Sequence, residues 1–209
     1  MKKTLNEIIM LESTAPRHEP LIARKHRSAV SVHRPTAGEI EYIHNLTKAE
    51  IRASKVPLPV IMAVYKHNRD SFWGVYQAPS RDRKDPRILG YYAFLHLNQA
   101  GRAALERDEF DASKLDLSLL VPTGVRPAAI YIWAVVARRL AWIATPLVVR
   151  ALGTELYGDL PIYTKAGTMG GLNVIKGYGF HSAREAEAGL GHLFRLDPSV
   201  AEKTSIEAA

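Results

Sequence analysis

The chain has 209 residues, of which 47% are hydrophobic, and it carries 28 Lys and Arg residues against 21 Asp and Glu residues. This length suits one domain of roughly 100–200 residues, and the apolar share is enough for a buried core. Because cysteine is absent, disulfide scaffolds, thiolate metal sites, iron–sulfur clusters and cysteine nucleophiles are excluded. The net charge of +7 favours anionic ligands such as nucleotides, phosphates, nucleic acid or an acidic membrane face, without choosing among them.

Membrane and secretion signals are weak in this sequence. The longest apolar runs, residues 127–137 and 140–149, are separated by Arg138 and Arg139. Each run is shorter than the roughly 20 residues of a membrane-spanning helix. Near the N-terminus, polar and acidic residues interrupt the apolar stretch that a secretory signal needs. We therefore expect a cytoplasmic protein without a membrane partner.

Three regions are expected along the chain: a basic, partly flexible arm over residues 1–30, a globular domain over residues 31–200, and a flexible tail over residues 201–209. Positions 17–34 hold five Lys or Arg residues and three His residues against one Glu. A solvated leader explains this composition. The alternative is contact with an anionic partner, including nucleic acid.

The domain is predicted to open with a strand and two helices. Apolar and polar residues alternate over positions 29–33, as in a half-buried strand. Thr36 followed by Glu39 has the spacing of a capping box, in which each side chain satisfies a backbone donor of the first helical turn. The apolar residues that follow recur on one helical face. They are Ile40, Ile43, Leu46 and Ile51. Prolines at positions 57 and 59 end this helix or begin the next, which runs to about residue 67.

A hairpin follows. Residues 71–77 read as a strand, residues 78–87 as a charged turn, and residues 88–97 as a strand that is apolar on both faces and hence interior. A short polar helix over residues 99–110 and an irregular connection over residues 111–125 come next.

The second half alternates strands and helices. Residues 128–137 are the most strand-like segment, a helix is expected around residues 146–152, and another strand over residues 160–166. Thr168 opens a helix that stops at Gly177 or Gly179. Short strands are expected from Phe180 and over residues 191–196. This order predicts a three-layer α/β/α domain of the α/β class with a mixed sheet.

Residues 160–182, LPIYTKAGTMGGLNVIKGYGFHS, resemble the C-terminal half of the GNAT superfamily of acyl-CoA-dependent N-acyltransferases. Many members have a strand, a Thr-led helix with a Gly-Leu pair, and a Gly-Phe pair where the helix turns into the next strand. Here these are residues 161–165, Thr168, Gly171-Leu172 and Gly179-Phe180. The resemblance covers about residues 31–196. It implies a mostly antiparallel sheet with a splayed parallel strand pair, residues 128–137 being the central cofactor strand.

The resemblance also implies acetyl-CoA, or another acyl-CoA, as co-substrate and no metal. The pantetheine arm would lie in the wedge between the two parallel strands and pair with free backbone groups, as an added strand does. Ala134, Val135 and Val136 are expected to make these contacts. Asn173 either lines the cofactor groove or is a plain helix-surface residue.

The family's phosphate loop, Q/R-x-x-G-x-G/A, is matched best by RLAWIA over residues 139–144, where Trp142 replaces the first glycine. Alternatively, Thr145 and Pro146 start the helix late, and residues 138–144 form a longer loop. In either case the arginines at the strand end suit the diphosphate oxygens. The expected contacts at this end are Arg138, Arg139, Ala141, Trp142, Ala144 and Thr145.

Acyl transfer to an amine needs a base for the ammonium proton and an acid for the leaving thiolate. The family often places a Glu on the central strand, which has no carboxylate here, and a Tyr at the position of Ile175. Tyr178, Tyr131 and His96 are the substitutes that we consider. For each, a structural role is the stronger explanation: Tyr131 and Tyr178 as core or wall aromatics, and His96 as a strand-end residue.

The leading hypothesis is an N-acyltransferase whose amine acceptor, a small molecule or a protein, enters over the face bounded by the first two helices and residues 99–125. The alternative is a binding or regulatory module that has lost turnover, because Trp142 and Ile175 depart from the family pattern. Nucleic-acid contact through the arm ranks third. A homodimer is left open.

Overall fold

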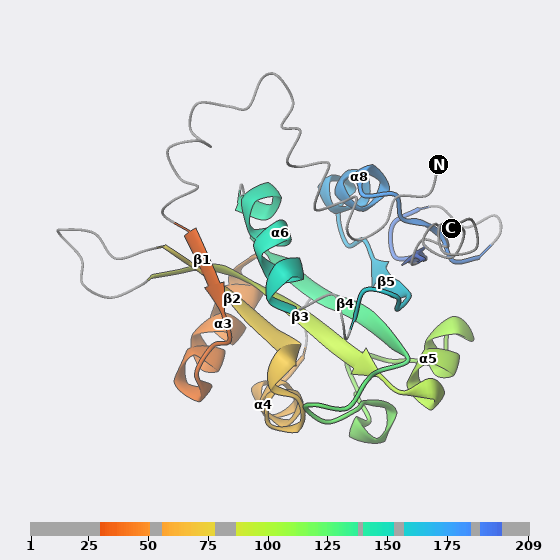
Figure 1. The fold of residues 1–209 in the computed structure, drawn as a ribbon, viewed down its shortest axis with the longest axis horizontal. Coiled ribbons are helices and arrows are strands. Elements are labelled where there is room, and N and C mark those ends of the chain that lie inside the picture. Colours follow the sequence, from red (N-terminus) through yellow and green to blue (C-terminus); the bar gives the residue numbers. More distant parts are fainter. Residues whose placement is uncertain are drawn as a thin grey trace, which may run out of the picture.

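The computed structural model describes residues 30–50, 56–77, 87–137, 140–152, 157–184 and 189–197. Its strands form one seven-stranded sheet in the order β1-β2-β3-β4-β5-β7-β6. Figure 1 labels the first five of these strands. The strands are β1 (Val30–His33), β2 (Phe72–Gln77), β3 (Arg87–Leu97), β4 (Ala129–Val136), β5 (Ile162–Lys165), β6 (His181–Ser182) and β7 (Leu193–Leu196). The helices are α3 (Ala37–Glu50), α4 (Leu58–His67), α5 (Gln99–Glu106), α6 (Ala141–Leu152) and α8 (Met169–Gly177), with short 3-10 turns η2 (Arg69–Ser71) and η3 (Leu117–Leu119).

The sheet is mixed. Neighbouring strands are antiparallel throughout, except that β4 and β5 run parallel. A parallel pair needs a crossover connection, and α6 supplies it here. The predicted fold class, a mostly antiparallel sheet with one parallel pair, is therefore confirmed. The insertion of β7 between β5 and β6 departs from simple chain order.

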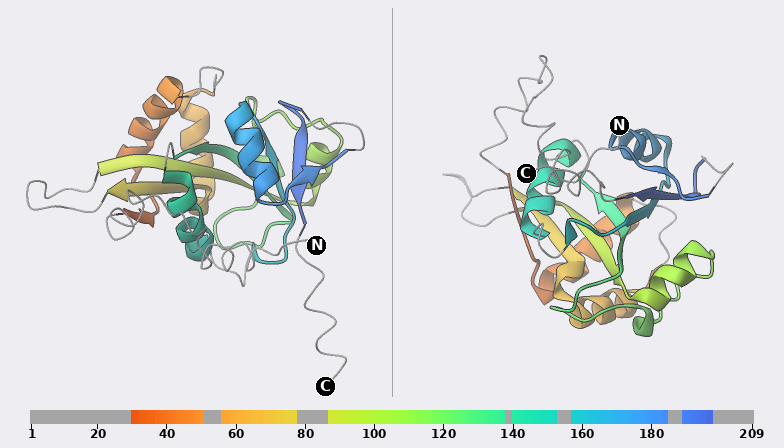
Figure 2. Two further views of the ribbon diagram at one scale, coloured as in Figure 1. Left: turned by 90° about the horizontal axis from the view of Figure 1, so that it is seen from above. Right: turned by 45° about the vertical axis from the view of Figure 1, so that its right-hand side comes forward.

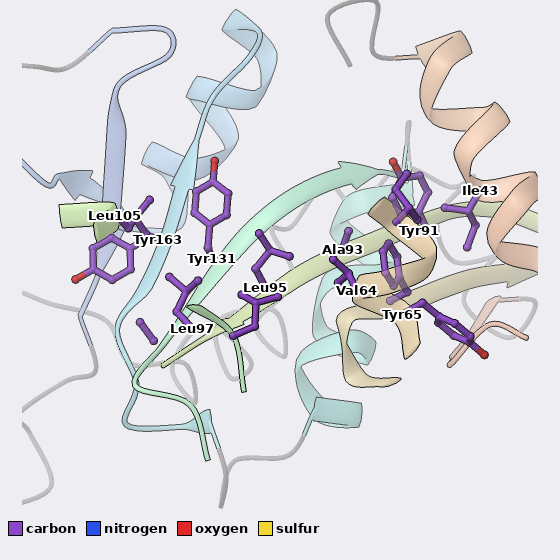
Figure 3. Packing of buried hydrophobic residues seen from close by; sticks show 14 of the residues in the cluster. Ile43, Val64, Tyr65, Tyr91, Ala93, Leu95, Leu97, Leu105, Tyr131 and Tyr163 are labelled. Atoms are coloured by element: carbon purple, nitrogen blue, oxygen red, sulfur yellow. The ribbon is translucent and has the colours of Figure 1, made fainter. Parts of the chain in front are cut away.

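Helices cover both faces of the sheet, as the alternation of β3 shows. Tyr91 and Leu95 belong to a first core cluster, which α3 and α4 complete, whereas Tyr92 and Phe94 belong to a second cluster under α6. Figure 2 shows α3 and α4 on one side of the sheet and α6 on the other. Figure 3 shows the first cluster, whose labelled members include Ile43, Val64, Leu105, Tyr131 and Tyr163.

The capping box at the start of α3 is confirmed. The backbone N–H of Thr36 donates to Glu39 Oε2 at 2.7 Å, and the N–H of Glu39 donates to Thr36 Oγ1 at 3.4 Å. These bonds satisfy two backbone donors at the start of α3. In the turns that follow, Ile40 and Ile43 are fully buried. Ile51, the last predicted apolar position, lies outside the described residues.

Two helix boundaries differ from the sequence prediction. Helix α6 begins at Ala141 instead of Pro146, directly after a turn in which the N–H of Leu140 donates to the Ala137 carbonyl at 2.7 Å. Thr145 is therefore not an N-cap, and its hydroxyl lies 2.7 Å from the hydroxyl of Tyr92. Helix α5 ends at Glu106, because Asp108 adopts a left-handed φ of 64° that cannot continue a helix.

Several predictions concern residues outside the described ranges and stay predictions. These are the arm over residues 1–29, the charged turn over residues 78–86, Arg138 with Arg139, and the C-terminal residues 198–209. Among the described helices, none has the length and apolarity needed to cross a membrane. Within the same ranges, no group of three or more His, Asp or Glu side chains is arranged to hold a metal ion.

Candidate cofactor site at the split between β4 and β5

The parallel strands β4 and β5 pair over three positions only. Ile130 pairs with Ile162, Tyr131 with Tyr163, and Ile132 with Thr164. Beyond this point β4 continues to Val136 against β3, and β5 continues to Lys165 against β7. The two strands therefore part after Ile132, and Figure 3 shows their ribbons diverging. We call this place the split.

A β-bulge in β4 coincides with the split. In the β3–β4 ladder Ala93 pairs with Ala134 and Phe94 pairs with Ile132. Trp133 is therefore an extra residue that has no pairing partner in β3. A bulge changes the direction of a strand and the orientation of its side chains. Accordingly, Trp133 and Ala134 both pack against the first core cluster, although neighbours in a regular strand point to opposite faces. The bulge thus turns β4 away from β5.

The backbone of Val135 is directed toward the side that β5 has left. Before the bulge, the N–H of Ile130 donates to the Pro161 carbonyl at 3.1 Å and so faces β5. After it, the Val136 carbonyl lies against β3, since a Cβ placed on Gly90 would be 2.1 Å from that oxygen. Successive residues of a strand direct their backbone groups to opposite neighbours. Of the three predicted backbone contacts, Val135 therefore faces the split, whereas Ala134 and Val136 face β3.

The N-terminus of α6 lies at the end of β4. Residues 141–144 form its first turn, so their N–H groups and the helix dipole are placed to attract an anion. Ala144 is fully buried in the second core cluster and can offer only its backbone. The side chains of Ala141 and Trp142, and all of Arg138 and Arg139, lie outside the description. Because α6 begins at Ala141, the first of the two sequence alternatives, a phosphate loop over residues 139–144, is favoured over a longer loop followed by a late helix.

Helix α8 starts shortly after β5. Thr168 is its N-cap and accepts a hydrogen bond from the N–H of Gly171 at 3.0 Å, as the Thr-led pattern predicted. Asn173 is exposed on α8, and Tyr178 is half-buried at its C-terminal end, where its N–H donates to the Val174 carbonyl at 3.0 Å. Asn173 thus belongs to the helix that follows the split, and Tyr178 is the C-cap residue of that helix.

Tyr131 is the catalytic candidate nearest the split. It belongs to the second of the three β4–β5 pairs, and in Figure 3 its ring extends toward the diverging side of the two strands. The side chain is 7% exposed and lies 5.9 Å from the ring of Phe110. Burial raises the pKa of Tyr131 to about 12, so the hydroxyl keeps its proton at neutral pH.

His96 lies deep in the structure, away from the split. It is in register with Ile130, is 1% exposed, and has the Tyr157 ring at 5.4 Å. Neither of its ring nitrogens has a hydrogen-bond partner among the described residues. Burial lowers the pKa of His96 to about 4, with the nearby charge of Asp70 opposing this shift. The ring is therefore neutral at physiological pH.

We expect His96 to make the fold acid-sensitive. The unfolded chain takes up this proton near pH 6.5 and the folded chain only near pH 4. Stability is therefore lost as the pH falls between these values, by on the order of 3 kcal/mol in all. Urea unfolding at several pH values should show that the free energy of unfolding falls less steeply with decreasing pH for His96→Gln than for the wild type. If the free energies of unfolding of the two proteins fall in parallel with pH, His96 is not the cause of the acid sensitivity.

Sequence reasoning missed a polar group on the first-cluster face. The hydroxyl of Tyr163 donates to Glu106, and Arg102 Nε donates to the same carboxylate at 3.1 Å. Burial opposes ionisation of Glu106, but these hydrogen bonds together lower its pKa. Burial first and the bond to Glu106 second raise the pKa of Tyr163 to about 12. No sequence pattern could have predicted this group, because Tyr163 of β5 and Glu106 of α5 meet only through tertiary packing.

An ion pair joins β5 to the segment that follows α5. Lys165 Nζ lies 3.2 Å from Asp108 Oδ1, and Arg184 lies 3.6 Å from the other oxygen of Asp108. The bond from Lys165 is the largest cause that lowers the pKa of Asp108. Residues 106–110 thus cross the first-cluster face near the split, touching Tyr163, Lys165 and, through Phe110, Tyr131.

Two hollows in the described surface lie elsewhere. One of about 440 Å³ is bordered by Arg34, Tyr65 and Arg69 near the start of α3. The other, of about 490 Å³, is bordered by Arg102, Arg126 and Asp159 near the N-terminal ends of β4 and β5. The split lies at the C-terminal end of the β4–β5 pairing, so neither hollow is the candidate cofactor site.

No family model and no curated protein matches the sequence. Solved structures do match the fold. Arabidopsis thaliana NAA60 in complex with acetyl-CoA has a TM-score of 0.51 and 13% identity, over 80% of this chain and 99% of that chain. A histone acetyltransferase HPA2 and related acetyltransferase from Corynebacterium glutamicum has a TM-score of 0.44 and 12% identity, over 82% and 98%. PH1933 from Pyrococcus horikoshii has a TM-score of 0.45 and 10% identity, over 82% and 99%. The likeness to NAA60 and the sheet with its parallel pair β4–β5 show that the chain has the GNAT-like α/β fold.

Proposed function

We propose that this protein is an acyl-CoA-dependent N-acyltransferase, which transfers an acetyl or other acyl group to an amine. The observation that carries the proposal is the parting of β4 and β5 after three pairs, with the backbone of Val135 directed to the side that β5 has left. The likeness in fold to NAA60, whose structure contains acetyl-CoA, supports the same choice of co-substrate.

In this proposal the pantetheine arm binds at the split as an added strand. The N–H of Val135 donates to an amide oxygen of the arm, and its carbonyl accepts from an amide N–H. The diphosphate lies against the first-turn N–H groups of α6, residues 141–144, where the helix dipole favours negative charge. Arg138 and Arg139 add positive charge at this end.

The acceptor amine approaches over the first-cluster face, beside residues 106–110. Its neutral nitrogen attacks the thioester carbon, a C–N bond forms and the C–S bond breaks. The surplus proton on the nitrogen passes to solvent as the CoA thiolate leaves, and the group that protonates the thiolate regains its own proton from solvent. Tyr131 is the proposed donor of a proton to that thiolate, because its hydroxyl is protonated at neutral pH and the residue precedes the last β4–β5 pair by one position. Tyr178 is the second candidate. His96 has no part in the proposal, because its ring is buried in contact with Tyr157.

Acetyl-CoA is expected to bind the folded chain and to stabilise it. At a ligand concentration 100 times Kd, the gain in unfolding free energy would be about 2.7 kcal/mol. Isothermal titration and a thermal-shift series measure both effects, with acetate as the ligand control. The absence of heat and of any thermal shift at millimolar acetyl-CoA, with the chain folded, would overturn the proposal. Binding without transfer across a panel of amines would favour the regulatory alternative.

A further inference from the structure

Lys165 stands at the split, directly across from the β4 bulge. The last β4–β5 pair joins Ile132 to Thr164, so a continued register would pair Trp133 with Lys165. The strands part at this position instead. Lys165 is also the only lysine within the described strands.

The side chain of Lys165 extends over the face from which the acceptor amine is proposed to approach. Tyr163, two residues earlier in β5, belongs to the first core cluster, and residues two apart in a strand share a face. The contact of Lys165 Nζ with Asp108 Oδ1 at 3.2 Å places the amine beneath the segment that follows α5. Trp133 packs on the same face, with its ring 6.3 Å from that of Phe72.

Asp108 holds this amine in place. It is the only non-glycine residue with positive φ in the described ranges, and this conformation turns the chain back over β5 after α5 ends. Arg184, at 3.6 Å, contacts the same carboxylate from the other side. Phe110, further along the segment, packs on Tyr131 at 5.9 Å between ring centres. The amine of Lys165 thus lies on the face over which the acceptor amine is proposed to approach.

We propose that Lys165 is an internal acyl acceptor, so that the chain acylates its own Lys165 when an acyl-CoA is bound. This proposal rests on the proposed function. The ammonium first loses a proton to solvent, and the neutral Nζ attacks the thioester carbon. A C–N bond forms, the C–S bond breaks, and Tyr131 protonates the departing thiolate. The nitrogen loses its second proton to solvent, from which Tyr131 regains its own. The products are an amide on Lys165, free CoA and one proton, with no change in oxidation state.

Site-resolved mass spectrometry tests the proposal. The full chain is incubated with acetyl-CoA, and acetyl occupancy is followed at Lys165 and at Lys176, a lysine near the end of α8 that serves as an internal control. We expect Lys165 to be acetylated at least about tenfold faster, because proximity replaces a bimolecular encounter. Its half-time should not depend on the chain concentration, and the rate should increase with pH, because the amine must lose a proton before attack.

Two variants distinguish acylation of Lys165 at the proposed site from non-specific acylation of exposed lysines. Lys165→Arg keeps the charge beside Asp108 and should remove the modified site while leaving the heat of acetyl-CoA binding unchanged. Lys176→Arg should leave acetylation of Lys165 unchanged. If acetyl-CoA binds but Lys165 is acetylated no faster than Lys176, or no faster than in the urea-unfolded chain, internal acylation is wrong and the proposed function survives. If acetyl-CoA does not bind at all, both proposals fail together.

Discussion

Val135→Pro is expected to lower the affinity for acetyl-CoA at least about tenfold while leaving the fold intact. Proline removes the backbone N–H that faces the split and places its ring there. One lost hydrogen bond costs about 0.5–1.5 kcal/mol, and the ring adds a steric penalty, where 1.4 kcal/mol is a factor of ten in Kd. Proline is tolerated in a strand where its nitrogen faces away from the ladder, and Val135 meets this condition. Isothermal titration measures the loss, and circular dichroism checks the fold.

Two matched substitutions test whether the effect comes from the backbone. Val135→Ala keeps the N–H and should bind acetyl-CoA within a few-fold of the wild type, because the Val135 side chain is already 41% exposed. Val136→Pro removes an N–H that faces β3 and should destabilise the whole domain. Wild-type affinity in folded Val135→Pro would show that the cofactor does not use the β4 backbone, and the proposed site at the split would be wrong.

Gly90→Ala is expected to lower the free energy of unfolding by about 1–3 kcal/mol, the usual cost of overpacking a tight interior position. The new Cβ would lie 2.1 Å from the Val136 carbonyl oxygen and 3.0 Å from the Ala137 Cα. Both are backbone atoms at the end of β4, so relief requires the strand itself to move. Because Val135 is in this segment, acetyl-CoA affinity should fall as well. Urea unfolding measures the first effect and titration the second.

The control is Gly170→Ala in the first turn of α8. Apart from its chain neighbours and the backbone of α8 itself, nothing lies within 4 Å of a Cβ at Gly170, so the substitution introduces no clash. Alanine also favours helix over glycine, so this variant should be at least as stable as the wild type. Equal stability of Gly90→Ala and Gly170→Ala would mean that β3 and β4 are not in the close contact that directs Val136 toward β3.

Local sequence patterns predicted most of the elements, because those patterns act within a few residues. Thr36 and Glu39 form the capping box that their spacing predicted, and Thr168 caps α8. The apolar run that became β3 is interior, between β2 and β4. Of the two starts that the sequence allowed for α6, the later one, with Thr145 as N-cap and Pro146 as first helical residue, is wrong. In the folded chain a tight turn at Ala137 starts the helix first, and Thr145 bonds to Tyr92 instead.

The sequence by itself determined the order of strands and helices, the caps of α3 and α8, and which strands are buried, since hydrophobic periodicity and short-range hydrogen bonding encode these features. Only the tertiary structure decided where β4 and β5 part, that Trp133 is the bulged residue, and that Val135 turns its backbone toward the split. The meeting of Lys165 with Asp108 and of Tyr163 with Glu106 was decided in the same way. A strand register and a contact between residues 57 positions apart depend on how whole elements pack, which no local pattern records.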